Sequence, residues 1–164
     1  MLKSIVIAAA LLVSAAAGLS LLNQTAPSVQ AHCQVPCGIF DEDARLKALY
    51  EDAATIEKAM NLMNELAGKT DAQSQQQFIR WTITKEEHAE RIITVTSAYF
   101  LAQRLKPVAP GDEGYDEYLR QLAQHHSLII AAMKSKQTTE TDVVVTLRDA
   151  IHDLEHIWSE THDH

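Results

Sequence analysis

The 164-residue chain contains few of the residues that break helices or cross-link a fold. Only 5 glycines and 4 prolines are present, which argues against an all-β protein rich in turns. Aromatic residues make up 5% of the chain, and two cysteines are too few for a disulfide framework. Lysine and arginine number 14 against 22 acidic residues, so we expect no nucleic-acid partner. The remaining composition, with 46% apolar and 22% charged residues, is that of one globular domain.

The first 31 residues have the pattern of a secretory signal peptide. Lys3 precedes residues 5–22, which carry no charge, and small residues surround a cleavage boundary after Ala31. We therefore predict an exported protein, periplasmic or extracellular, whose first residue is His32. An uncleaved anchor is the alternative, because the 18 residues of the uncharged run just reach the length of a membrane span. Cleavage leaves 133 residues, removes Lys3 and so changes the formal charge from −8 to −9, and leaves no expected contact with a membrane.

Apolar residues recur at helical spacing in four segments after residue 40, and no strand-like alternation of useful length occurs. Asp41 is a candidate N-cap for the first helix, and Gly68 is its candidate stop. Asp71 opens a longer second helix, which Pro107 ends. The predicted inward-facing residues are Leu46, Leu49, Tyr50, Ala53, Ile56, Met60, Met63 and Ala67 in the first helix, and Phe78, Trp81, His88, Ile92, Val95, Tyr99, Ala102 and Leu105 in the second.

A loop rich in proline and glycine, residues 107–114, separates the second helix from a third. The sequence Thr139-x-x-Asp142 resembles a capping box at the start of a fourth helix. The predicted inward-facing residues are Tyr115, Tyr118, Leu119, Leu122, Ile129 and Met133 in the third helix, and Val144, Leu147, Ile151, Leu154 and Trp158 in the fourth. Residues 32–164 are therefore predicted to be one all-α domain, an antiparallel four-helix bundle that follows a hook of residues 32–40.

Both cysteines lie in one short stretch of the hook, HCQVPCG, at residues 32–38. Removal of the signal peptide gives His32 a free α-amine, a group with a reference pKa of about 7.7–8.0, from which a metal readily displaces a proton. Cys33 adds an amide nitrogen and a thiolate, and Cys37 adds a second thiolate after the turn at Pro36. Two nitrogen and two sulfur donors in one plane favour nickel or copper over tetrahedral zinc. A Cys33–Cys37 disulfide in an oxidising compartment is the alternative at this point.

The pattern H-C-x-x-P-C-G-x-[YF] at a processed N-terminus resembles the metal hook of the nickel superoxide dismutase family. Weaker matches at Thr55–Met60, Gln77–Trp81 and Lys85–Ala89 extend the resemblance over essentially all 133 mature residues. Members of that family are homohexamers of four-helix bundles, and they convert two superoxide ions and two protons to O₂ and H₂O₂. The resemblance therefore implies one nickel ion per subunit, which cycles between Ni(II) and Ni(III).

By the same resemblance, His32, Cys33 and Cys37 are the metal-binding and catalytic residues. The expected ligands are the His32 amine, the Cys33 amide and the two thiolates, with the His32 imidazole as an axial ligand in the oxidised state. Two positions depart from the family pattern. Gln34 stands where an acidic residue is common, and Phe40 stands where a tyrosine hydroxyl usually faces the open axial side.

Residues of the first two helices are candidates for supporting roles. Glu51 and His88 are candidates for orienting the His32 imidazole, although the sequence does not decide between them, and a packed core histidine is an equal interpretation of His88. Arg45 and Lys47 are candidates for steering the superoxide anion against the negative charge of the whole chain. Lys85 is a third candidate, but we predict that it lies on a solvated face.

Two histidine patterns and one further function are alternatives. His152 and His156 form an H-x-x-E-H sequence like that of inverted zinc proteases, but only the end of the chain remains to supply a third ligand. A polar helix face is therefore the preferred interpretation of that sequence. His125 and His126 are adjacent, and we predict that they lie on the bundle surface or in an interface. A non-catalytic exported bundle that binds nickel or copper through the same hook is the alternative function.

Overall fold

A computed structural model describes residues 38–159, and every regular element within that range is helical. The elements are α2 (Glu42–Leu66), α3 (Ala72–Val95), η1 (Thr96–Arg104), α4 (Tyr115–Lys136) and α5 (Asp142–Ser159). The π-helix η1 continues directly from α3, so the two form one long helical segment. The predicted signal peptide and residues 32–37 of the predicted hook lie outside the described residues.

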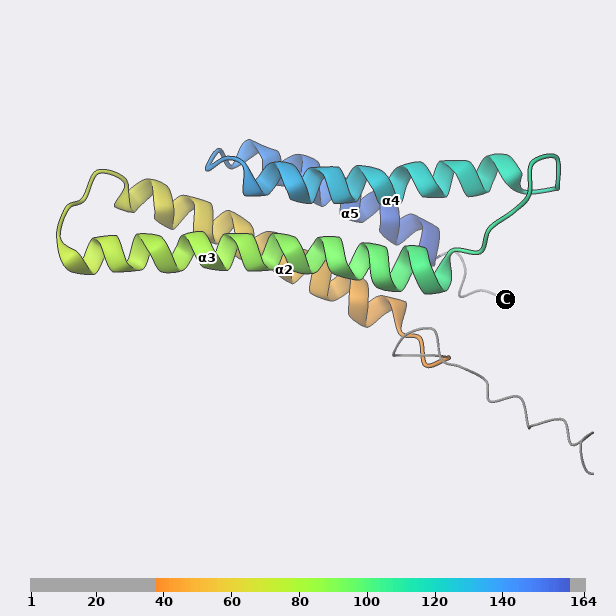
Figure 1. The fold of residues 1–164 in the computed structure, drawn as a ribbon, viewed down its shortest axis with the longest axis horizontal. Coiled ribbons are helices and arrows are strands. Elements are labelled where there is room, and N and C mark those ends of the chain that lie inside the picture. Colours follow the sequence, from red (N-terminus) through yellow and green to blue (C-terminus); the bar gives the residue numbers. More distant parts are fainter. Residues whose placement is uncertain (1–37, 160–164) are drawn as a thin grey trace, which may run out of the picture. The chain divides into compact units, whose positions relative to one another are not determined.

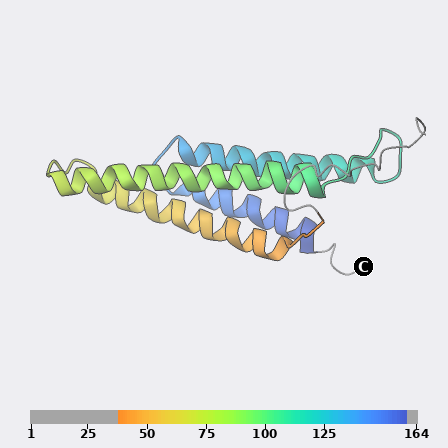
Figure 2. The ribbon, with the colours of Figure 1, turned by 60° about the horizontal axis from the view of Figure 1, so that its bottom comes forward.

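Successive helices of the described part run in opposite directions and pack side by side (Figure 1, Figure 2). Helix α2 packs against α3 and α5, and α4 packs against α5 and the segment formed by α3 and η1. Each helix therefore has two neighbours, the arrangement of a helical bundle. The predicted all-α class is confirmed. No helix within residues 38–159 has the length and apolar character needed to cross a membrane.

The predicted boundaries of α2 and the predicted start of α3 are confirmed. The Asp41 carboxylate accepts a hydrogen bond from the backbone N–H of Ala44 at 2.9 Å, and the Asp71 carboxylate accepts one from Ser74 at the same distance. Gly68 follows α2 with a φ of +79°, a left-handed conformation that glycine adopts without strain. The capping box at Thr139 is a different case. Helix α5 begins at Asp142, so this residue is the first of the helix and not the third.

The core contains the predicted stripe of α5 and that of α2 except Ala67, which is the exposed C-cap of α2, so its predicted inward position was wrong. Helix α4 presents a different face. Leu119 and Met133 were predicted to face inward, yet each is 43% exposed. The buried residues of this helix are His125, Leu128, Ala131, Ala132 and Ser135. Two stripes at helical spacing overlap along α4, and the stripe that contains small residues is the one that packs against the other helices. The predicted face of this helix was therefore wrong at both of those positions.

The π-helix changes which residues of the second helical segment face the core. Its hydrogen bonds run from residue i+5 to residue i, as in the 2.8 Å bond from the Leu105 N–H to the Phe100 carbonyl. The wider turn buries both Tyr99 and its neighbour Phe100, together with Gln103, whereas Ala102 is exposed. The prediction that Ala102 faces the core was wrong because it assumed one α-helical period up to Pro107.

Candidate functional site

The three predicted metal ligands, His32, Cys33 and Cys37, lie outside the described residues. The structure does describe the segment that joins them to the bundle. Gly38 has a φ of +76° and is exposed, and the side chain of Ile39 is 79% exposed. The first side chain in this segment that packs against the core is that of Phe40.

Phe40 belongs to a group of five residues at the end of the bundle where α2 begins and where η1 and α5 end. We call this group the Arg104 cluster; it consists of Phe40, Glu42, Tyr99, Arg104 and Trp158. The Arg104 guanidinium carbon lies 4.3 Å from the centre of the Phe40 ring and 5.6 Å from the centre of the Trp158 ring. The Arg104 Nε also donates a hydrogen bond to Glu42 Oε1. One guanidinium therefore joins the start of α2 to the end of α5.

Tyr99 holds the same segment through its hydroxyl group. The Tyr99 oxygen accepts a hydrogen bond from the backbone N–H of Asp41 at 3.0 Å, and its proton is directed to Glu42 Oε1 at 3.4 Å. Burial raises the pKa of Tyr99 above its ordinary value, and Glu42 adds to this effect, so the hydroxyl remains protonated and able to donate. The Phe40 ring lies edge-on to the Tyr99 ring, with the two centres 6.0 Å apart.

Glu42 is the buried charge of this cluster, with 2% of its side chain exposed. A buried carboxylate is destabilising unless a cation and hydrogen-bond donors surround it. The guanidinium of Arg104 supplies the charge, and the hydroxyl of Tyr99 supplies a further donor. The carboxylate therefore depends on two residues of η1 for its place at the start of α2.

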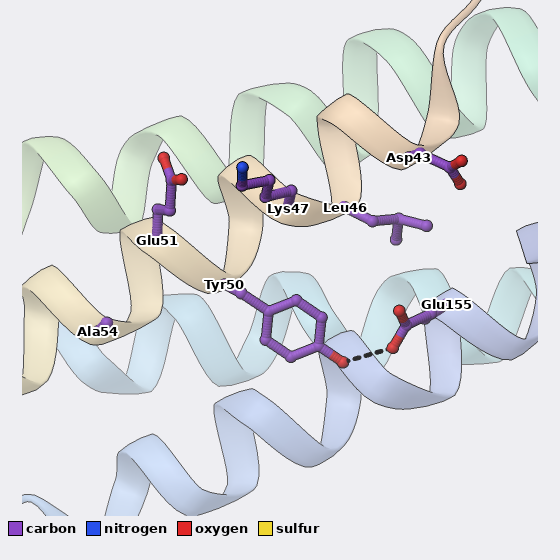
Figure 3. Close-up of a pocket in the computed structure, with 7 residues that line it drawn as sticks. All are labelled: Asp43, Leu46, Lys47, Tyr50, Glu51, Ala54 and Glu155. Carbon is purple, nitrogen blue, oxygen red and sulfur yellow. Dashed lines mark hydrogen bonds between the residues drawn. The ribbon is translucent and has the colours of Figure 1, made fainter.

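A surface hollow of about 490 Å³ opens beside the first turns of α2 (Figure 3). Its polar lining includes the carboxylates of Asp43, Glu51 and Glu155 and the ammonium of Lys47. The Tyr50 hydroxyl donates to Glu155 at 2.8 Å. Burial, together with the smaller effect of this contact, raises the pKa of Tyr50 to about 12. Acidic groups outnumber the single cation, so the hollow itself is a poor site for an anion.

Of the predicted supporting residues, His88 has a clear structural partner. Its Nδ1 lies 2.6 Å from Asp52 Oδ1, and Arg91 lies 3.4 Å from the same oxygen. This contact joins α3 to α2, in agreement with the interpretation of His88 as a packed histidine. Glu51 is exposed on α2 and lines the hollow. His32, which either side chain was predicted to orient, lies outside the described residues.

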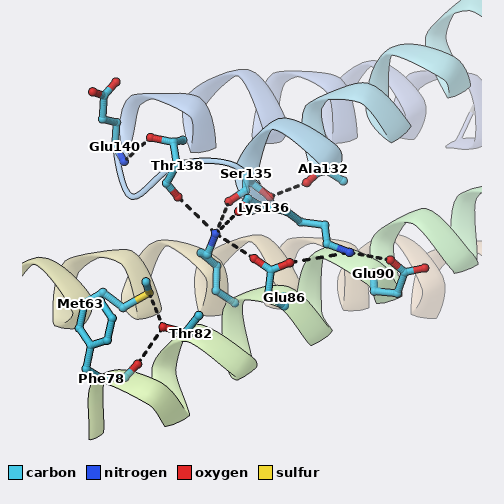
Figure 4. Close-up of polar contacts among 11 residues, drawn as sticks. Met63, Phe78, Thr82, Glu86, Glu90, Ala132, Ser135, Lys136, Thr138 and Glu140 are labelled. Atoms are coloured by element: carbon cyan, nitrogen blue, oxygen red, sulfur yellow. Dashed lines mark hydrogen bonds and ion pairs between the residues drawn. The ribbon is translucent and has the colours of Figure 1, made fainter. Parts of the chain in front are cut away.

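Lys85 is buried, with 3% of its side chain exposed, so the prediction of a solvated face was wrong. Its ammonium donates to the backbone carbonyl groups of Ser135 at 3.0 Å and Thr138 at 3.3 Å, and to that of Lys136. It also lies 3.1 Å from a carboxylate oxygen of Glu86. Figure 4 labels Glu86 together with Ser135, Lys136 and Thr138, whose carbonyl groups accept from this ammonium. Because the carbonyl groups at the end of α4 have no partners within the helix, the ammonium takes that place.

The other histidines form no metal site within the described residues. His125 is fully buried within the bundle, so its predicted place on the surface or in an interface was wrong, whereas its neighbour His126 is exposed. The rings of His152 and His156 are both exposed, with their centres 4.4 Å apart. Among residues 38–159, no group of three or more His, Cys, Asp or Glu side chains is arranged to hold a metal ion.

The model of the nickel-containing superoxide dismutase family matches residues 27–162. This chain belongs to that family. It is therefore an oxidoreductase that acts on superoxide, and its metal is nickel, as the sequence predicted. The match begins before His32 and covers all four α-helices. Searches of curated proteins and of solved structures gave no match.

Nothing in the sequence of this superoxide dismutase indicated the Arg104 cluster. Glu42 and Arg104 are 62 positions apart, and neither belongs to a recognisable motif. An acidic residue directly after an N-cap is ordinary, because it complements the positive end of the helix. The one available signal was an arginine close to the end of a long helix and three residues before Pro107, which is too common to identify a buried ion pair.

Proposed function

We propose that this superoxide dismutase works at a processed N-terminus, where His32, Cys33 and Cys37 hold one nickel ion per subunit. The observation that carries the proposal is the place of both cysteines, within six residues of a predicted cleavage site, in a chain of a nickel-containing family. The donor chemistry fits the metal, because two thiolates, one amide nitrogen and one amine suit a planar nickel site. The His32 imidazole would supply a further nitrogen ligand to the oxidised metal.

When bound, nickel supplies a one-electron Ni(II)/Ni(III) couple, by which two superoxide ions and two protons give O₂ and H₂O₂. The thiolates of Cys33 and Cys37 and the amide of Cys33 contribute negative charge that stabilises the higher oxidation state. The amine of His32 and both thiols must lose their protons to bind, so metal affinity falls as the pH falls. The peroxide product is a hazard to the same thiolates, because it oxidises exposed cysteine.

The proposal includes export and assembly. Residues 1–31 are the proposed signal peptide, which places the enzyme in the periplasm or outside the cell. The proposed assembly is a homohexamer, for which the bundle has apolar surface available: Ile79 and Ile83 of α3 are 59% and 51% exposed. Light scattering of the native enzyme is expected to give the mass of six mature chains. A fully active monomer would contradict this part of the proposal.

The experiment that tests the site compares the wild-type enzyme with Cys33→Ser and Cys37→Ser, each expressed with its leader and supplied with nickel. Mass spectrometry of the wild type is expected to give His32 as the first residue, and elemental analysis is expected to give one nickel per chain. Rapid superoxide consumption is expected for the wild type and not for either variant, and wild type loaded with zinc serves as the inactive control.

Three results would contradict the proposed site. The first is an intact leader in the active enzyme, and the second is a permanent Cys33–Cys37 disulfide in active preparations. The third is full activity of Cys33→Ser with nickel. Nickel bound by the wild type in stoichiometric amount without turnover would favour the alternative, a bundle that only binds the metal.

A further inference from the structure

We propose that Arg104 is a positioning residue for the metal hook. It acts through Phe40 and Glu42, and so fixes the direction in which the chain passes from the bundle to Cys37. The inference rests on the proposed function, because that proposal places the metal at residues 32–37. No motif in the sequence marks Arg104, and only its contacts distinguish it from other arginines.

The contacts of the Arg104 cluster converge on three consecutive residues, which are the first of the described residues to pack against the bundle. Phe40 lies against the guanidinium, Asp41 donates its backbone N–H to Tyr99, and Glu42 pairs with Arg104. Gly38 and Ile39 are exposed. The fixed point closest to Cys37 among the described residues is therefore Phe40, only three positions away.

The chemistry of the side chain makes arginine the suitable residue at this point. The flat face of a guanidinium stacks on aromatic rings while its edge donates hydrogen bonds. Arg104 uses its face toward Phe40 and Trp158 and its Nε toward Glu42. A lysine ammonium has no flat face, so it cannot make both kinds of contact with the same geometry.

The π-helix places Arg104 where these contacts form. Within η1, Tyr99 and Arg104 are five residues apart, and both reach Glu42 at the start of α2. Hydrogen bonds from residue i+5 to residue i widen the turn, so residues five apart lie on one side of the helix. Segments of π-helix are frequent at functional sites, and here the segment supplies two residues that hold the base of the hook.

A fixed base raises the metal affinity of a short chelating segment. Any short chain segment loses conformational freedom when its donors come together around a metal, and this loss opposes binding. Anchoring its last residues in the metal-free protein removes part of that cost. Supporting residues around metal ligands typically change metal affinity by about 10- to 100-fold when they are mutated, which sets the size of the expected effect.

The test measures the nickel dissociation constant of the full mature enzyme, by competition with a chelator of known affinity. Arg104→Met removes the charge and the flat face, and Phe40→Leu removes the ring while leaving the pair of Arg104 and Glu42 intact. Each substitution is expected to raise the nickel dissociation constant at least about 10-fold. Phe40→Leu keeps the inference testable if Arg104→Met fails to fold, because it leaves no buried charge without a partner.

Lys85→Met is the matched control, because Lys85 is another cation of the second helical segment that holds two elements together. Its partners are Glu86 and backbone carbonyl groups at and just after the end of α4, and none belongs to the Arg104 cluster. It is expected to lower the melting temperature without changing the nickel dissociation constant more than about twofold. Hydrogen exchange supplies a second readout. The Asp41 amide, which donates to Tyr99, is expected to exchange faster in metal-free Phe40→Leu than in the metal-free wild type.

Unchanged nickel affinity in Phe40→Leu and in folded Arg104→Met would overturn the inference. An equal loss of affinity in Lys85→Met would overturn it as well, since the effect would then follow from stability in general. Failure of the proposed function gives a different result: wild type and Cys33→Ser would bind nickel alike, whatever residue stands at position 104.

Discussion

At the scale of single residues, His125 shows how burial sets the chemistry of a side chain. Its ring is fully buried and packs edge-on to Trp158, with the ring centres 5.8 Å apart. Nδ1 lies 2.7 Å from the Gln121 carbonyl oxygen, which can only accept, so Nδ1 carries the proton. Nε2 has no hydrogen-bond partner among the described residues. Burial lowers the pKa of His125 below its ordinary 6.5, against a smaller opposite effect of the bond to Gln121.

This shift predicts a loss of stability in acid. Below about pH 6.5 the unfolded chain takes up a proton on His125, whereas the folded protein keeps the ring neutral until a lower pH. The unfolded state therefore binds more protons, and the free energy of unfolding falls as the pH drops from 7 toward 5. His125→Phe keeps an aromatic ring and removes the titration, so its free energy of unfolding should fall less over the same range.

Urea unfolding at a series of pH values measures the effect in both proteins. The two chains share every other titratable group, including the hook, so the difference between their pH profiles reports His125 alone. Parallel profiles for wild type and His125→Phe would show that the ring is not held neutral by the fold.

Only part of the candidate site could be predicted from the sequence. The prediction of His32, Cys33 and Cys37 as ligands rests on residue types of distinctive chemistry at short spacing, and all three lie outside the described residues. The Arg104 cluster could not be predicted, since it joins residues from α2, η1 and α5 whose proximity depends on how the bundle packs. The burial of a charged residue such as Glu42 is evident only from the structure, because sequence patterns assign charged residues to the surface.

At the scale of helices, the sequence predicted elements well and faces unevenly. Local hydrogen bonds determine where a helix begins, so the starts of α2 and α3 could be predicted from Asp41 and Asp71. The spacing of apolar residues likewise predicted the inward faces of α2 and α5. The face of α4 was not predictable, since small buried residues such as Ala132 carry little apolar signal beside the exposed Met133. The π-helix was also missed, because a change of helical period leaves no motif in the sequence.

Lys85 connects two helices at the scale of elements, and its loss is expected to destabilise their contact. Its ammonium donates to the backbone carbonyl groups of Ser135 and Lys136, which end α4 and have no partner within the helix. Lys85→Met fills a similar volume but removes these donors. A hydrogen bond that involves a charged group contributes about 1.5–3 kcal/mol, so we expect the free energy of unfolding to fall by about 2–3 kcal/mol.

Urea unfolding of Lys85→Met measures this loss, and hydrogen exchange locates it. The amides of residues 133–141 should show the largest increase in exchange rate, because they belong to the end of α4 and the turn to α5. Lys136→Met is the matched control: Lys136 lies at the same place but is more exposed, with its ammonium paired to Glu90 at 2.8 Å. Its loss should be below about 1 kcal/mol.

At the scale of the whole molecule, the negative net charge repels the anionic substrate. The chain without its proposed leader carries a formal charge of −9, and superoxide is an anion. Steering therefore depends on cations near the start of α2 that lie within about 10 Å of the path of the anion. Moderate salt screens the interaction between charges that are farther apart. Arg104 is paired with Glu42, and Arg45 lies over the Tyr99 ring. Lys47 is exposed and has no carboxylate within ion-pair distance among the described residues.

Lys47→Gln is accordingly expected to lower kcat/KM for superoxide by about twofold at low salt, the effect of one charge ~10 Å from the path of an anion in water. The effect should shrink as ionic strength rises, because salt screens the interaction. Lys69→Gln is the matched control: it changes the net charge equally, but Lys69 follows α2 at its far end, about 30 Å along the helix axis. Pulse radiolysis at several salt concentrations measures both variants. Equal losses would assign the effect to net charge, and no loss in Lys47→Gln would remove this lysine from the approach of the substrate.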